Sequence, residues 1–150
     1  MEKIVVAIDF TEVTSKVLEV AIKMAKLNEA KLYLIHADTM EVYIDFANMY
    51  TPPPFELYEK QKKVVEEKMD VIHSTLDKSK IEHECIIIEG PTVKTILEQL
   101  KELEADLLII GSHRHGKLYH FLMGNIHESL ITKSQCPVMV IPPLDEEKDG

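Results

Sequence analysis

Short, continuously apolar segments alternate along this chain with longer segments in which apolar residues recur every three or four positions. The short segments are rich in Val and Ile, which is typical of strands buried on both faces of a sheet. Five segments have this character: Ile4–Ile8, Leu32–Ala37, Cys85–Ile88, Leu107–Ile110 and Val138–Ile141. We predict a strand at each of them.

The longer segments have the period of helices with one apolar stripe, which would pack on the sheet. The stripes contain Val13, Val17, Val20 and Met24; Val65, Met69, Ile72 and Leu76; and Val93, Ile96, Leu97 and Leu100. We expect Thr11 or Thr14 to cap the first helix and Gly90-Pro91-Thr92 to begin the third. Asn125 is expected to cap a fourth helix that runs to about Ser134.

This order of elements predicts one α/β domain with an open, doubly wound, five-stranded parallel sheet of the Rossmann-like class. Ligands of such sheets bind beyond the carboxyl ends of the strands, where the strand order reverses. Asp9 and Gly111 each follow a predicted strand. Their proximity is a hypothesis, because the sequence does not determine the strand order.

We expect residues 1–143 to form the domain and residues 144–150 to form an acidic tail. The connection from Asp38 to Pro54 contains Pro52-Pro53-Pro54. Connections of this length are usually lids, binding loops or mobile surface loops, and the sequence leaves these alternatives open.

Charge and composition narrow the class of partner. The chain has 150 residues, and 17 Lys and Arg against 26 Asp and Glu give a formal net charge of −9. This charge disfavours nucleic acid, and no apolar run approaches the roughly 18 residues of a membrane-spanning helix. We therefore expect a soluble, cytoplasmic protein without a nucleic acid or membrane partner. Cys85 and Cys136 form no CxxC pair, so we expect both to be buried, reduced and without chemistry.

The segment from Gly111 to His127 contains most of the candidate chemistry. It leaves a predicted strand, passes through a polar loop and enters a predicted helix. Gly111 would let a ligand approach the backbone, and Gly124 and Asn125 at the helix start would present N–H groups and a positive dipole end. Such a place in an α/β fold suits a phosphate group.

These features resemble the universal stress protein family, whose nucleotide-binding members carry a Gly-x2-Gly-x9-Gly-Ser/Thr pattern after the fourth strand. Gly111 and Gly124 keep the spacing of the first and last glycines. The resemblance extends over nearly the whole chain and includes Ile4–Phe10, Ile35–Ala37, Gly90-Pro91, Ala105–Ser112 and Cys136–Ile141. It implies an adenine nucleotide alpha hydrolase-like fold, an ATP site and a homodimer. Any Mg²⁺ would accompany the ATP on its phosphates.

The resemblance also implies a role for individual residues in the ATP site. Asp9 would accept hydrogen bonds from the ribose hydroxyls, and Ala37 would lie against adenine. The remaining implied contacts are Ala7 and Ile8 at the first strand end, Ile110, Gly111 and His113 around the ribose and phosphates, and Gly124, Asn125, Ile126 and His127 at the phosphates.

Two positions depart from the family pattern. Arg114 replaces the middle glycine, and Asn125 replaces the Ser or Thr. The Arg114 side chain would either block the close approach that glycine permits or add a guanidinium to the phosphates.

Other interpretations remain open from the sequence. Asp9 can instead hydrogen-bond the loop that follows its own strand. His113, His115, His120 and His127 provide a metal-site hypothesis, although their spacing is not diagnostic and no dedicated metal site is predicted. A third hypothesis is a signalling dimer without a ligand. No catalytic residue is predicted, because the chain lacks a Gly-x-Ser-x-Gly elbow and a Walker lysine motif.

The final strand, Val138–Ile141, is expected at a sheet edge, where unpaired backbone groups favour pairing with a second copy. Pro142-Pro143 would end that strand. The alternative is that the loop from Asp38 to Pro54 covers this edge.

Overall fold

The five predicted strands form one parallel sheet in the computed structural model, which describes residues 1–38, 55–112 and 126–142. Its order is β3-β2-β1-β4-β5, and every neighbouring pair is parallel. The strands are β1 (Lys3–Ala7), β2 (Lys31–Asp38), β3 (His83–Glu89), β4 (Leu107–Gly111) and β5 (Val138–Ile141). The order confirms the doubly wound fold, and it reverses direction between β1 and β4.

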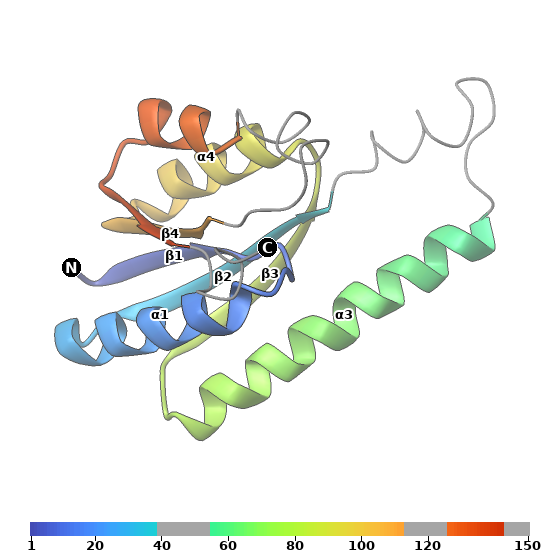
Figure 1. Cartoon of the computed structure of the whole chain (residues 1–150), viewed down its shortest axis with the longest axis horizontal. Coiled ribbons are helices and arrows are strands. Elements are labelled where there is room, and N and C mark those ends of the chain that lie inside the picture. The colour runs from blue at the N-terminus through green and yellow to red at the C-terminus, as the bar shows by residue number, and fades with distance from the viewer. Residues whose placement is uncertain (39–54, 113–125, 143–150) are drawn as a thin grey trace, which may run out of the picture.

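Helices cover both faces of this sheet (Figure 1). On one face lie α1 (Thr14–Asn28) and α3 (Phe55–Lys78), and on the other lie α4 (Thr92–Leu103) and a last helix that includes residues 126–133. Within β1, Ile4 and Val6 pack with the first pair of helices and Val5 packs with the second. All three side chains are fully buried, which explains why the strand is apolar from Ile4 to Ala7.

The entry into α1 differs from the prediction. Neither Thr11 nor Thr14 caps the helix, because Val13 is the N-cap residue and makes no side-chain capping bond. Asp9 Oδ1 instead accepts hydrogen bonds from the Thr11 backbone N–H at 3.1 Å and from Thr11 Oγ1 at 2.8 Å. The buried Thr14 hydroxyl has no hydrogen-bond partner among the described residues. The Asp9 carboxylate therefore engages Thr11 before the helix begins.

The entry into α4 agrees with the prediction. Pro91 is the N-cap residue, and its backbone is extended. Gly90 has φ of +150°, and a Cβ added there would lie 2.8 Å from Thr95 Oγ1. Glycine is required here because a side chain would be strained by both the backbone angle and the contact.

Asp106 joins the amino-terminal ends of two neighbouring strands, at the opposite end of the sheet from the crevice. Its Oδ2 accepts hydrogen bonds from the backbone N–H groups of Glu2 at 2.8 Å and Lys3 at 3.0 Å. These two backbone bonds lower the pKa of Asp106. This carboxylate joins the starts of β1 and β4, far along both strands from the carboxyl ends.

Three of the expectations fall outside this description. The connection 39–54, the acidic tail and the Asn125 cap all lie outside the described residues, although the helix that Asn125 would begin is present as far as residue 133. Within the described ranges, the structure contains no helix with the length and apolar character needed to cross a membrane.

Candidate functional site

A crevice of about 270 Å³ opens at the carboxyl ends of β1, β2 and β4, where the sheet order reverses. β1 pairs directly with β4, with Val6 opposite Ile109, so the residues that follow the two strands are brought together. Asp9 and Gly111 both line the crevice. Their predicted proximity is confirmed.

The crevice contains all of the predicted site residues that the structure describes. These are Ala7, Ile8, Asp9, Ala37, Ile110, Gly111, Ile126 and His127. The other predicted contacts, His113, Arg114, Gly124 and Asn125, lie outside the described residues, as do His115 and His120 of the histidine hypothesis.

The sequence interpretation missed six further lining residues, which are Thr11, Ile35, His36, Thr92, Ile96 and Leu130. His36 could have been predicted, because it directly precedes Ala37, a predicted site residue, at the end of a predicted strand. Ile96 belongs to the predicted apolar stripe of its helix, but a stripe does not show which of its residues reach a cavity. The walls are thus mainly apolar, with a few polar groups, as is usual for a small-molecule site.

Two histidines hold the backbone at the crevice. His36 Nδ1 lies 2.7 Å from the Ile8 carbonyl oxygen, and His127 Nε2 lies 2.7 Å from the Gly111 carbonyl oxygen. A carbonyl oxygen only accepts, so each of these ring nitrogens carries the hydrogen and donates it. The two bonds anchor the chain just beyond β1 and at the end of β4, the two strands that flank the switch point.

Asp9 combines a structural contact with a place in the crevice. Its side chain is exposed and lines the crevice while Oδ1 accepts the two hydrogen bonds from Thr11. The loop-bonding interpretation of Asp9 is therefore correct for this oxygen. A carboxylate has about four acceptor sites, so these bonds do not exclude a ligand hydroxyl.

Gly111 faces the crevice with its backbone, and its missing side chain makes room for α1. An added Cβ would lie 2.7 Å from Val13 Cγ1 and 2.9 Å from Val17 Cγ2. Both valines are buried, and β-branched side chains have little freedom to move aside. Close packing between β4 and α1 therefore requires glycine here, independently of any ligand.

Residues of two helices also reach the crevice. Thr92, the first residue of α4, lines it, and so do Ile126 and His127 of the last helix. The first turn of a helix presents unpaired N–H groups and a positive dipole end, which favour anions. The crevice thus combines apolar walls, a carboxylate and donors suited to a negative group.

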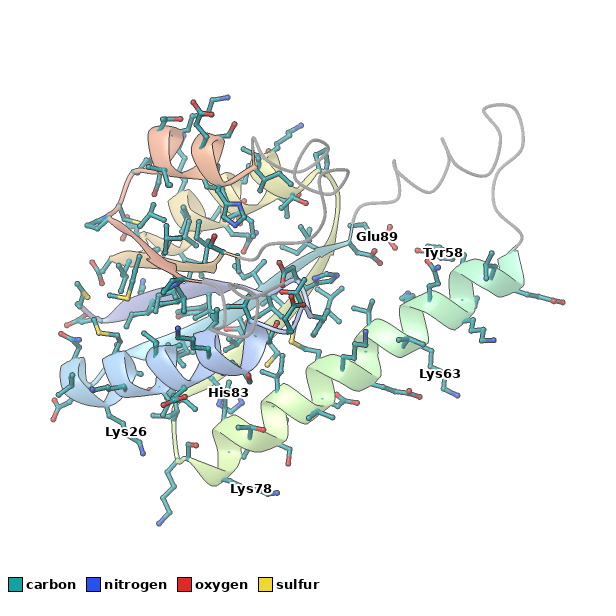
Figure 2. All side chains as sticks on the ribbon, in the orientation of Figure 1. Lys26, Tyr58, Lys63, Lys78, His83 and Glu89 are labelled. Atoms are coloured by element: carbon teal, nitrogen blue, oxygen red, sulfur yellow. The ribbon has the colours of Figure 1, made fainter. Side chains whose placement is uncertain are left out.

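Tyr58 links α3 to the carboxyl end of β3. Its hydroxyl donates a hydrogen bond to Glu89 at the end of β3, and the two residues lie together in Figure 2. This bond, with a smaller effect of burial, raises the pKa of Tyr58 to about 12. The contact anchors the first part of α3 beside the strand ends.

The prediction that both cysteines are buried is wrong, because Cys85 and Cys136 are each partly exposed free thiols. Burial, followed by the charges of Asp77 and Asp70, raises the pKa of Cys85 to about 11. Cys85 lies on β3 and packs against the core that α1 and α3 form with the sheet. It is not among the residues that line the crevice.

The fold and crevice define an α/β protein with a crevice at a topological switch point. The model of the universal stress protein family matches residues 1–142. The chain belongs to the universal stress protein family. Among curated relatives, it is similar to the universal stress protein YxiE of Bacillus subtilis, with 25% identity over 146 residues that cover 93% of this chain and 97% of the relative.

Solved structures have the same fold. The hypothetical protein MJ0577 is 26% identical, with a TM-score of 0.77 and coverage of 96% of this chain and 97% of that one. A family member from Arabidopsis thaliana with AMP bound has 17% identity, a TM-score of 0.71 and coverage of 98% and 95%. The universal stress protein from Archaeoglobus fulgidus in complex with dAMP has 20% identity, a TM-score of 0.66 and coverage of 94% and 98%.

Proposed function

We propose that the crevice binds an adenine nucleotide and that the protein is a cytoplasmic regulator of the stress response whose activity depends on this nucleotide. The observation that carries the proposal is the mixed lining of the crevice, with Asp9, apolar walls between the strands, and Ile126 and His127 from the first described turn of the last helix. Apolar walls suit a base, a carboxylate suits ribose hydroxyls, and helix N-termini suit phosphate. Relatives of the same fold have been solved with AMP and dAMP.

Each part of the nucleotide has a proposed place. Ala37 and neighbouring apolar residues would face adenine, and Asp9 would accept hydrogen bonds from the ribose. Ile126, His127 and the undescribed Gly124 and Asn125 would face the phosphates. We propose ATP as the physiological nucleotide, with Mg²⁺ carried on its phosphates; binding, rather than catalysis, is the proposed activity.

Isothermal titration calorimetry with ATP and Mg²⁺, AMP, adenosine and inorganic phosphate tests this function. We expect saturable binding of both nucleotides, weaker binding of adenosine and the weakest binding of phosphate. The absence of heat and of a thermal shift with millimolar nucleotide would overturn the proposal and favour a signalling protein without a ligand.

We further propose that two copies join through β5. This strand lies at the edge of the sheet and pairs only with β4 among the described strands, and Val140 is exposed. The carbonyl oxygens of Pro137 and Ile141 accept hydrogen bonds from the β4 side. Because backbone groups alternate along a strand, those of Val138 and Val140 point to the open edge. A second β5 related by a two-fold axis would pair with them.

Val140→Pro tests this interface. Proline at position 140 removes an N–H that points away from β4, so the sheet should keep its internal ladder while the intermolecular ladder is broken. Light scattering should give twice the mass of the 17.2 kDa chain for the wild type and the mass of one chain for the variant. A monomeric wild-type protein, or a variant that remains a dimer, would contradict the interface.

A further inference from the structure

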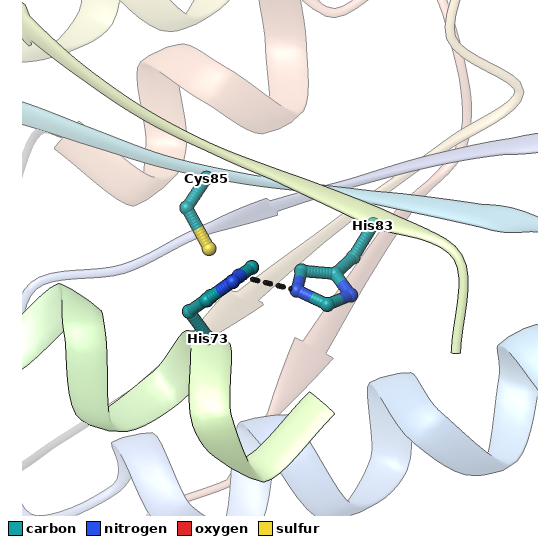
Figure 3. A group of neighbouring side chains, drawn as sticks. All are labelled: His73, His83 and Cys85. Carbon is teal, nitrogen blue, oxygen red and sulfur yellow. Dashed lines mark hydrogen bonds between the residues drawn. The ribbon is translucent and has the colours of Figure 1, made fainter. Parts of the chain in front are cut away.

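Three side chains of the kinds that bind metal ions lie together between α3 and β3, apart from the residues that line the crevice. His83 and Cys85 are two positions apart on β3 and therefore share one face of the strand. His73 projects toward them from α3 (Figure 3). One nitrogen of each ring and the Cys85 sulfur all lie within 4.8 Å of one another.

The His83 ring is held in the orientation of a metal ligand. Its Nδ1 lies 2.7 Å from the Ile81 carbonyl oxygen, so Nδ1 carries the hydrogen and Nε2 has the lone pair. A backbone carbonyl that accepts from the second ring nitrogen is the usual support of a histidine bound to a metal. The His83 side chain is only 4% exposed, which keeps the ring in place.

The His73 ring has the matching arrangement. Its Nε2 lies 3.3 Å from Asp77 Oδ2, one helical turn further along α3, and a carboxylate favours a hydrogen on the nitrogen beside it. The lone pair of His73 is then on Nδ1. Asp77 would orient His73 as second-shell carboxylates orient histidine ligands of zinc.

These two tautomers point two lone pairs at each other. His83 Nε2 and His73 Nδ1 are 2.7 Å apart, and both would be acceptors. A proton held between the two nitrogens, as in the hydrogen bond drawn in Figure 3, or a cation between the rings resolves this conflict, and only a metal ion would also engage the nearby thiol. Asp70, Asp77, Glu66 and Glu84 lie around the cluster and supply negative charge.

We propose that His73, His83 and Cys85 form a binding site for a divalent metal ion of the zinc class. Two imidazoles and one thiolate are a ligand set that zinc accepts, with water in the fourth position. Zinc bonds to nitrogen at about 2.0–2.1 Å and to sulfur at about 2.3 Å, so tetrahedral ligand atoms are separated by roughly 3.3–3.6 Å. Side-chain adjustment brings the cluster to this spacing. The metal would fasten α3 to the edge strand β3, independently of the nucleotide crevice.

Titration of the reduced protein with Co²⁺ alone, followed by Zn²⁺ alone, tests the site. We expect a thiolate-to-cobalt charge-transfer band that saturates with one equivalent of Co²⁺ and disappears when Zn²⁺ is added. Cys85→Ser should abolish the band, and the matched control Cys136→Ser should keep it. The band distinguishes this site from histidines of the segment 113–127, which would bind metal without a thiolate.

Two further measurements protect the test from a folding artefact. His73 is exposed, so His73→Ala should fold normally and weaken Co²⁺ binding at least roughly tenfold through the loss of one ligand. Zn²⁺ should raise the unfolding temperature of the wild type and leave that of Cys85→Ser unchanged. Absence of the thiolate band, its persistence in Cys85→Ser, or an unchanged affinity in His73→Ala would overturn the proposal.

Discussion

Asp9→Ala is expected to weaken the binding of AMP by roughly tenfold to a hundredfold. Hydrogen bonds to a charged group contribute about 1.5–3 kcal/mol, and each 1.4 kcal/mol corresponds to a factor of about ten in affinity. Asp9 lines the crevice, and its proposed partners are the ribose hydroxyls. The variant should therefore lose far less affinity for inorganic phosphate than for AMP, which calorimetry measures directly.

Asp9 also accepts hydrogen bonds from Thr11, so the loop itself needs a control. Asp9→Asn keeps an oxygen for Thr11 and removes the charge, and we expect it to remain weakened toward AMP. Full affinity in Asp9→Asn would show that the charge of Asp9 contributes nothing to binding. Asp106→Ala is the matched control, since it removes another exposed carboxylate bonded to backbone N–H groups at the opposite end of the sheet. It should leave the affinity unchanged.

Gly111→Ala is expected to lower the free energy of unfolding by about 1–3 kcal/mol, the usual cost of overpacking a well-packed core. The added methyl would be under 3.0 Å from side-chain atoms of Val13 and Val17. Chemical denaturation should show this loss as a lower midpoint without a change in slope. The nucleotide affinity of the folded variant should stay near that of the wild type, because the methyl points toward α1.

A double-mutant cycle identifies the partner of this methyl group. Val13→Ala removes the nearest contact, so Val13→Ala with Gly111→Ala should be more stable than the sum of the two single losses predicts. Contacting residues typically couple by about 0.5–3 kcal/mol. Additive losses would show that Val13 is not the partner of this methyl group, and a stable Gly111→Ala that no longer binds AMP would show that the glycine serves the ligand instead.

The strands were predictable because each contains a run of successive apolar residues. The central strands β1, β2 and β4 are mostly buried, as that pattern predicts. The prediction of burial on both faces is wrong for the edge strands β3 and β5, which are only partly buried and leave Ile87 and Val140 exposed. The helix stripes were predictable from apolar residues that recur every three or four positions, and Met69, Ile72 and Leu76 are indeed buried against the sheet. The pairing of β1 with β4 required the structure, since periodicity shows which face is buried but not which strand is adjacent. That pairing is what brings Asp9 to Gly111.

Local competition and long-range packing account for what the sequence did not show. The Thr11 hydroxyl donates a hydrogen bond to Asp9, and Thr11 therefore does not cap α1 as predicted. The group of His73, His83 and Cys85 depends on how α3 lies on β3. The spacing of His83 and Cys85 on one strand face is a local signal, but His73 joins them only through tertiary structure. The sequence therefore directed attention to the other histidines.

A ¹H–¹⁵N NMR titration of the wild-type protein with AMP tests the central claim most directly, because it reports both binding and position. We expect saturable shifts at the backbone amides of Ala7, Asp9, Ala37, Gly111 and His127, with little change around His83 at the start of β3. No shifts with millimolar AMP, or shifts that cluster away from the carboxyl ends of β1 and β4, would contradict the assignment of this crevice as an adenine nucleotide site.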